Sequence, residues 1–246
     1  MSTHIYKDSP RESGNAIWFI MLAIALTAAL TMTLTRSSDT GGQTGDIERA
    51  RVQASEIMRY ASGLEKTIDQ LALRGISESA ISFEVSFLSG YVNTRCADAD
   101  DECRLFGRGG GQTYMVPRDE WLDTANDTRD LYGEWYFTGS VCVDEVGTGT
   151  TGCATDGESN NEDLVMFLPW IKEDICRQIN ALLRLPVDPP VETAGAWPAA
   201  NTRFQGSFDD GEILDQTGQL SGCFAGSGAN MPPGGTFSYF HVLIDR

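Results

Sequence analysis

The chain has 246 residues, a net charge of −17 and two histidines. So acidic a chain should repel the phosphate backbone of nucleic acids and anionic lipid headgroups, and nucleic-acid binding is therefore not expected. The part that follows the N-terminal apolar run exceeds 200 residues, which is enough for one sizeable hydrophobic core or two small ones.

An apolar run comes first in the chain, after a short polar stretch. Residues 16–34 read AIWFIMLAIALTAALTMTL, which is 19 residues without a charge. A helix needs roughly 20 such residues to cross the hydrocarbon core of a bilayer. We therefore predict a transmembrane helix over residues 15–35 that anchors the chain in a membrane, with residues 1–14 as a leader or cytoplasmic tail.

Small residues recur at a spacing of four within this run, at Ala25, Ala29 and Thr33. Small side chains at this spacing let two helices approach closely. These positions are therefore predicted to pack against other copies of the chain or related subunits. The alternative is that alanine and threonine are simply common in membrane helices.

The junction between the polar start and the apolar run resembles a known processing site. The leader MSTHIYKDSPRESG is short and polar, and it ends in Gly14 directly before the run. It resembles the class III leader of type IV pilins and pseudopilins, and the likeness covers residues 1–75. The resemblance implies cleavage after Gly14, with Asn15 as the first mature residue. Phe19 stands where most of these proteins carry a glutamate, which some pseudopilins at filament tips also lack.

Residues 36–45 form a polar stretch with three glycines, which is predicted to break the helix. The pilin resemblance implies that this linker melts when a filament forms, and a flexible tether is the alternative. Residues 46–246 are then predicted to form an extracytoplasmic domain.

An amphipathic helix is predicted to open this domain, from an N-cap at Asp46 to about Arg74, with Gly75 as its stop. Its apolar stripe recurs in steps of three and four residues: Ile47, Ala50, Ala54, Ile57, Ala61, Leu64, Ile68 and Leu71. The alanines make a flat strip that suits close packing. We expect the later half of the helix to pack on the chain's own sheet and the alanine-rich earlier half to contact other subunits.

The rest of the domain alternates strand patterns with one helix pattern. Strands are predicted within 81–93, 112–117, 134–146 and 237–244, a buried strand or turn over 164–169, and a helix over 171–183. Residues 117–130 are predicted as a short helix or loop and residues 185–200 as a loop. A helix packed on a β-rich, disulfide-bonded body gives the α+β class.

Six cysteines follow the apolar run, and none forms a CxxC motif. An even count and wide spacing argue for disulfides and against zinc, and disulfides persist in oxidising compartments. The favoured pairing joins Cys96 to Cys103, Cys142 to Cys153 and Cys176 to Cys223, out of fifteen pairings that six cysteines allow. The domain is therefore expected outside the cytoplasm, and the pilin resemblance implies the periplasmic or extracellular side of a bacterial inner membrane.

The sequence contains no catalytic constellation, so the chain is not expected to be an enzyme. The motif GRGGGQ lacks the Lys-Ser/Thr of a phosphate loop, and His241 lies in an apolar strand where a packed, hydrogen-bonded role is expected. No cofactor is predicted. Acidic groups at residues 98–102, 156–163 and 209–212 carry the oxygens that calcium prefers, but a solvated acidic surface is the favoured interpretation.

These patterns predict a membrane-anchored structural subunit of a pilus-like or pseudopilus-like assembly, which acts through helix packing and protein–protein contacts. The alternative is a monomeric, membrane-tethered module that binds a ligand or mediates adhesion.

Overall fold

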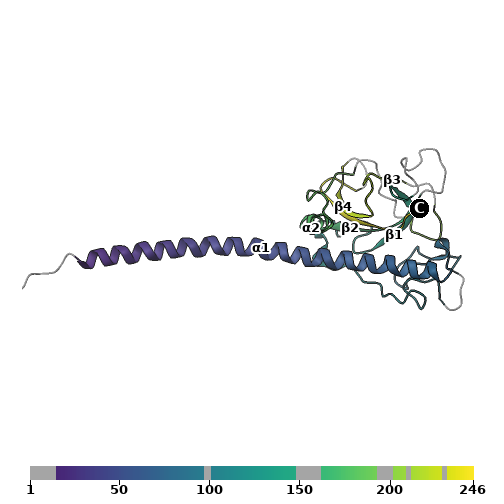
Figure 1. Cartoon of the computed structure of the whole chain (residues 1–246), viewed down its shortest axis with the longest axis horizontal. Helices are drawn as coiled ribbons and strands as arrows, with labels where there is room; N and C mark the ends of the chain where they lie inside the picture. Colours follow the sequence, from purple (N-terminus) through teal and green to yellow (C-terminus); the bar gives the residue numbers. More distant parts are fainter. Residues whose placement is uncertain (1–14, 97–100, 148–161, 193–201, 209–211, 229–231) are drawn as a thin grey trace, which may run out of the picture. The chain divides into compact units, whose positions relative to one another are not determined.

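The computed structural model describes residues 15–96, 101–147, 162–192, 202–208, 212–228 and 232–246, and its side chains except those of 15–16, 33–43 and 212. The chain divides into two compact units, residues 1–48 and residues 49–246. Helix α1 (Asn15–Leu73) begins in the first unit and ends in the second (Figure 1).

The first unit contains no membrane-spanning helix among its described residues. Nowhere in the described part of the chain is a helix both long and apolar enough to cross a bilayer. The described apolar stretch of α1, residues 17–32, is 16 residues long, which at 1.5 Å per residue is about 24 Å against a hydrocarbon core of about 30 Å. The predicted transmembrane helix over residues 15–35 is therefore wrong.

The predicted break in the helix is also wrong. Residues 36–45 have helical backbone, and α1 is one helix of 59 residues. Glycine in a helix interior costs about 1 kcal/mol relative to alanine, which weakens a helix without forbidding it. Three glycines in this stretch are therefore compatible with a continuous helix.

The end of α1 was predicted correctly. Gly75 has φ +88°, in the left-handed region that glycine adopts without strain. Its N–H donates to the carbonyl of Ala72, and the N–H of Ile76 donates to the carbonyl of Leu71. These two hydrogen bonds form a Schellman motif, in which carbonyls at the end of a helix that lack a partner within the helix accept N–H groups from the residues that follow.

The second unit is built on a five-stranded sheet with the order β3-β1-β2-β5-β4. Its strands are β1 (Tyr136–Val143), β2 (Asp163–Ile171), β3 (Glu212–Leu214), β4 (Ser221–Ala225) and β5 (Phe237–Ile244). Strand β3 pairs with β1 in parallel, and the other neighbours are antiparallel. Helix α2 (Glu173–Leu183) follows β2, and short 3-10 turns occur at Glu78–Ala80, Asp119–Trp121 and Thr124–Asn126.

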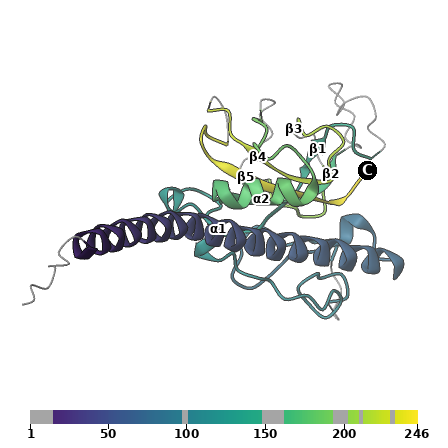
Figure 2. The ribbon, with the colours of Figure 1, turned by 60° about the vertical axis from the view of Figure 1, so that its left-hand side comes forward.

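The two faces of the sheet are covered differently. On one face, Phe137, Met166 and Tyr239 share a core with the apolar stripe of α1 and with Ile175 of α2. Figure 2 shows both helices on this side of the sheet. The opposite face carries a second apolar cluster, which includes Val141, Val143, Val165, Phe167, Leu214, Phe224, Phe240 and Val242. Residues alternate between these faces along β2 and β5, as the pleat requires, and a register shift between Thr138 and Val141 changes the alternation within β1. The α+β class of this unit is confirmed.

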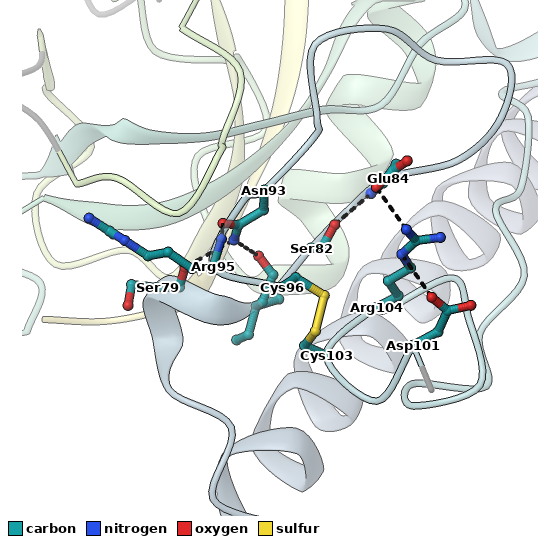
Figure 3. The surroundings of a disulfide bond; sticks show 10 residues. Ser79, Ser82, Glu84, Asn93, Arg95, Cys96, Asp101, Cys103 and Arg104 are labelled. Carbon is teal, nitrogen blue, oxygen red and sulfur yellow. Dashed lines mark hydrogen bonds and ion pairs between the residues drawn. A yellow bond between two sulfur atoms is a disulfide. The ribbon is translucent and has the colours of Figure 1, made fainter. Parts of the chain in front are cut away.

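The strands predicted within 134–146 and 237–244, the buried strand or turn at 164–169, which is strand β2, and helix α2 are confirmed, but the strands predicted within 81–93 and 112–117 are wrong. Residues 81–93 make only isolated bridges, such as Ser82 with Arg104 and Val85 with Leu88. Two backbone carbonyls at the start of this segment accept hydrogen bonds from a side chain instead of from a neighbouring strand. The amide of Asn93 donates to the carbonyls of Ser79 at 2.9 Å and Ile81 at 2.7 Å (Figure 3).

Two of the predicted disulfides join described cysteines. Cys96 bonds to Cys103, as Figure 3 shows. Cys176 of α2 bonds to Cys223 of β4. Cys142 is also disulfide-bonded, and its predicted partner Cys153 lies outside the described residues. These bonds indicate an extracellular or periplasmic location for the folded unit, because disulfides persist in oxidising compartments.

Candidate functional site

The most exposed apolar surface of the described chain is on α1, over residues 17–32, which we call the apolar segment. Every side chain of this segment is exposed. Ten of them are large and apolar, with 51–72% of their surface accessible: Ile17, Trp18, Phe19, Ile20, Met21, Leu22, Ile24, Leu26, Leu30 and Met32. They are consecutive or nearly so, and therefore occupy all sides of the helix.

The polar groups of the apolar segment are satisfied within the helix. The hydroxyl of Thr27 donates to the carbonyl of Ala23 at 2.9 Å, and that of Thr31 donates to the carbonyl of Thr27 at 3.0 Å. Threonine therefore interrupts the apolar surface little. A helix that is apolar on all sides is normally buried, and a contiguous exposed apolar surface marks an interaction site.

The predicted packing residues fall into two groups. Ala25 and Ala29 are exposed within the apolar segment. The side chain of Thr33 lies outside the described residues, so its packing role stays a prediction. Gly14 and the side chain of Asn15 also lie outside them, so the cleavage site stays a prediction.

Ala50, Ala54 and Ala61 instead lie in the chain's own core. They are 2%, 0% and 0% exposed and belong to the cluster that also contains Ile57 and Leu64. The expectation that Ala50 and Ala54 contact other subunits is therefore corrected, because the stripe turns toward the chain's own sheet from Ala50 onward.

His241 of β5 connects the sheet to α1 through a carboxylate. Its Nε2 lies 2.8 Å from Glu65 Oε2, and its Nδ1 lies 3.4 Å from the hydroxyl of Tyr239. Ser221 Oγ donates to the same hydroxyl at 3.1 Å. His241 is 7% exposed and Tyr239 is fully buried, so the imidazole is packed and hydrogen-bonded, as the sequence predicts. Glu65 was missed because 176 residues separate it from His241 in the chain.

Burial lowers the pKa of His241, against the smaller opposing effect of Glu65. The folded chain therefore binds this proton less readily than the unfolded chain, and stability is lost as pH falls below about 6.5. His241→Gln retains a donor for Glu65 but cannot titrate. We expect the free energy of unfolding, measured in urea from pH 8 to pH 5 by tryptophan fluorescence, to fall less with pH in the variant than in the parent. Equal slopes would show that His241 is not the titrating group.

Asp163 at the start of β2 is a buried carboxyl group, and its pKa shift changes stability with pH in the opposite direction to that of His241. It is 0% exposed and accepts the N–H of Val143 at 2.8 Å and that of Arg246 at 3.0 Å. Burial raises its pKa to about 6, and the two N–H donors oppose this rise. The carboxylate thus joins the C-terminal residue to β1.

Because the pKa of Asp163 is higher in the folded chain, its contribution to stability falls as pH rises from about 4 to 6. The difference between about 6 and the usual 3.8 corresponds to about 3 kcal/mol. We expect Asp163→Asn to remove this decrease, in urea titrations at pH 4, 5 and 6. A variant whose stability still decreases as steeply as that of the parent would contradict the assignment.

The acidic groups do not form a cation site in the described part of the chain. No cluster of three or more His, Cys, Asp or Glu side chains that could hold a metal ion occurs there. Asp98, Asp100, Asp156, Glu158, Asn160, Asp209 and Asp210 lie outside the described residues. Glu102 is exposed, Glu162 is buried, and the oxygens of Asp163 are occupied by backbone donors.

Within the described residues, the geometry thus offers an exposed apolar helix surface and a buried histidine that is paired with the partly exposed carboxylate of Glu65. Comparison with protein-family models, with curated proteins and with solved structures finds no match for this chain.

Proposed function

We propose that this chain is a structural subunit of an extracytoplasmic assembly, in which the apolar segment of α1 packs against the same segment of other copies. The observation that carries the proposal is the exposure of ten large apolar side chains on consecutive turns of one helix. Each large apolar side chain that becomes fully buried contributes about 1.5–3 kcal/mol, so leaving this surface in water is strongly unfavourable.

The distribution of the surface argues for several neighbours. A helix with a single apolar stripe can be covered by one partner helix. Apolar side chains on all sides, from Ile17 to Met32, require neighbours on more than one side. Ala25 and Ala29 are small, and they allow a neighbouring helix to approach closely on their side.

The test compares the oligomeric state of the full-length chain with that of Leu22→Lys/Leu26→Lys. We expect the parent to sediment as large oligomers, and the variant as smaller species with unchanged near-ultraviolet circular dichroism. The matched control is Ile47→Lys/Leu73→Lys, which places the same charges on exposed apolar positions of α1 outside the segment (53% and 87% exposed). The control should assemble like the parent.

A monomeric parent, or a variant that assembles as well as the parent, would overturn the proposal. It would favour a monomeric module whose globular unit binds a ligand.

A further inference from the structure

A groove of about 350 Å³ lies in the globular unit between the later half of α1 and the end of β5. Its apolar lining comes from Ile68, Ala72, Leu220, Val242, Leu243 and Ile244. Strand β4 ends its pairing with β5 at Ser221, opposite His241, so the last residues of β5 extend beyond it and reach the groove. Leu220 is 52% exposed at this place.

The groove also carries four carboxylates: Glu65, Asp69, Glu78 and Asp245. Two of them have partners, because Glu65 bonds to His241 and Glu78 lies 3.3 Å from Nε of Arg246. Asp69 and Asp245 are exposed and make no ion pair with any described residue. An apolar lining with two unpaired carboxylates fits a cationic side chain whose aliphatic stem can lie on the apolar part.

The complementary surface occurs on the same chain. Arg51 and Arg59 are exposed on α1, and they make no ion pair within the described residues. They are eight residues apart, about two turns, and so lie on one side of the helix. Val52, 58% exposed, lies next to them. We call these three residues the basic ridge.

The basic ridge cannot reach the groove of its own chain. Arg59 and Asp69 lie on one continuous helix, ten residues and therefore about 15 Å apart along the axis. A pairing of the basic ridge with Asp69 therefore requires another molecule.

We propose that the acidic groove of one copy receives the basic ridge of a second copy. Arg51 and Arg59 pair with Asp69 and Asp245, and Val52 packs against Leu220. The two surfaces are different, so the contact is head-to-tail: in a pair, the copy whose groove is occupied keeps a free ridge, and the other copy keeps a free groove, so further copies can add at both ends. This contact goes beyond the packing of the apolar segment and does not depend on it.

The test uses the full-length chain carrying Leu22→Lys/Leu26→Lys, so that packing of the apolar segment does not contribute. We expect this parent to associate reversibly at low salt in sedimentation velocity. Reversing the groove (Asp69→Arg/Asp245→Arg) or the ridge (Arg51→Glu/Arg59→Glu) should each weaken association about tenfold or more. An equimolar mixture of the two reversed variants should associate again, because the basic groove of one faces the acidic ridge of the other.

The matched control is Asp127→Arg/Asp130→Arg, an equal change of charge on exposed residues outside the groove, which should leave association unchanged. Absence of association in the parent, failure of the mixture to associate, or loss of association in the control would each overturn the proposal. Failure here leaves the packing of the apolar segment unaffected, since that is measured with the segment intact.

Discussion

Replacing Cys176 and Cys223 together by alanine is expected to lower the free energy of unfolding by about 4 kcal/mol. The two residues are separated by 47 positions, so their bond removes the entropy of a large loop from the unfolded chain. In a unit of this size the loss corresponds to a decrease in Tm of about 8–16 °C. Thermal unfolding followed by tryptophan fluorescence measures it, because Trp121, Trp135 and Trp170 are buried in the globular unit.

The bond between Cys96 and Cys103 supplies the comparison. It spans only seven positions, and the same loop-closure argument gives about 2 kcal/mol for its removal by alanine at both residues. Equal losses for the two pairs, or a larger loss for the shorter loop, would contradict the expectation that loop length decides the effect.

Asn180→Leu is expected to cost about 2–6 kcal/mol, although leucine is similar in size. Asn180 of α2 is fully buried, and its amide bonds to both backbone groups of Cys223 in β4. Its Nδ2 donates to the Cys223 carbonyl at 2.9 Å, and its Oδ1 accepts the Cys223 N–H at 2.9 Å. Leucine leaves both buried backbone groups without a partner, at about 1–3 kcal/mol each.

Two measurements make this expectation specific. Urea unfolding of Asn180→Leu should be compared with that of Gln178→Leu, a half-buried position on the same helix that should change stability by about 0.5 kcal/mol or less. Hydrogen exchange at the Cys223 amide should accelerate only in the Asn180 variant. Unchanged stability together with unchanged exchange would show that the amide contributes nothing to β4.

The effects of Asn180 and Cys176 should not be additive. Cys176 and Asn180 lie four residues apart on α2, and both hold Cys223. When either connection is lost, the other still positions β4, so the combined variant reports the coupling between them.

The strongly patterned elements were predictable from the sequence. The apolar stripe from Ala50 to Leu71 specifies a helix with one buried side, and Gly75 supplies the left-handed residue that ends it. The residue patterns of β1 and β5 predict strands because successive side chains along a strand point to opposite faces of the sheet. The cysteine pairs 96–103 and 176–223 agree with the favoured pairing.

What failed depended on contacts that a local pattern does not contain. Residues 81–93 have the β-branched and aromatic composition of a strand, yet Asn93 bonds to the carbonyls of Ser79 and Ile81 and no strand partner is in place. Glu65 meets His241, and Asn180 meets Cys223, only after α1, α2 and the sheet have come together. The apolar run at residues 16–34 has near the length of a membrane span by composition, but no helix in the described part of the chain is both long and apolar enough to cross a bilayer.

The outer side of β4 has a consequence for how copies of this chain can join. The backbone N–H and carbonyl of Cys223 are hydrogen-bonded to the side chain of Asn180. The N–H of Ala225 donates to the carbonyl of Pro190, and its carbonyl accepts the N–H of Glu192. At the other margin, β3 has only three residues. Unprotected strand margins are where proteins fuse into aggregates. Because β4 is largely covered and β3 is short, we expect copies of this chain to meet through helix surfaces and side chains rather than by the addition of strands.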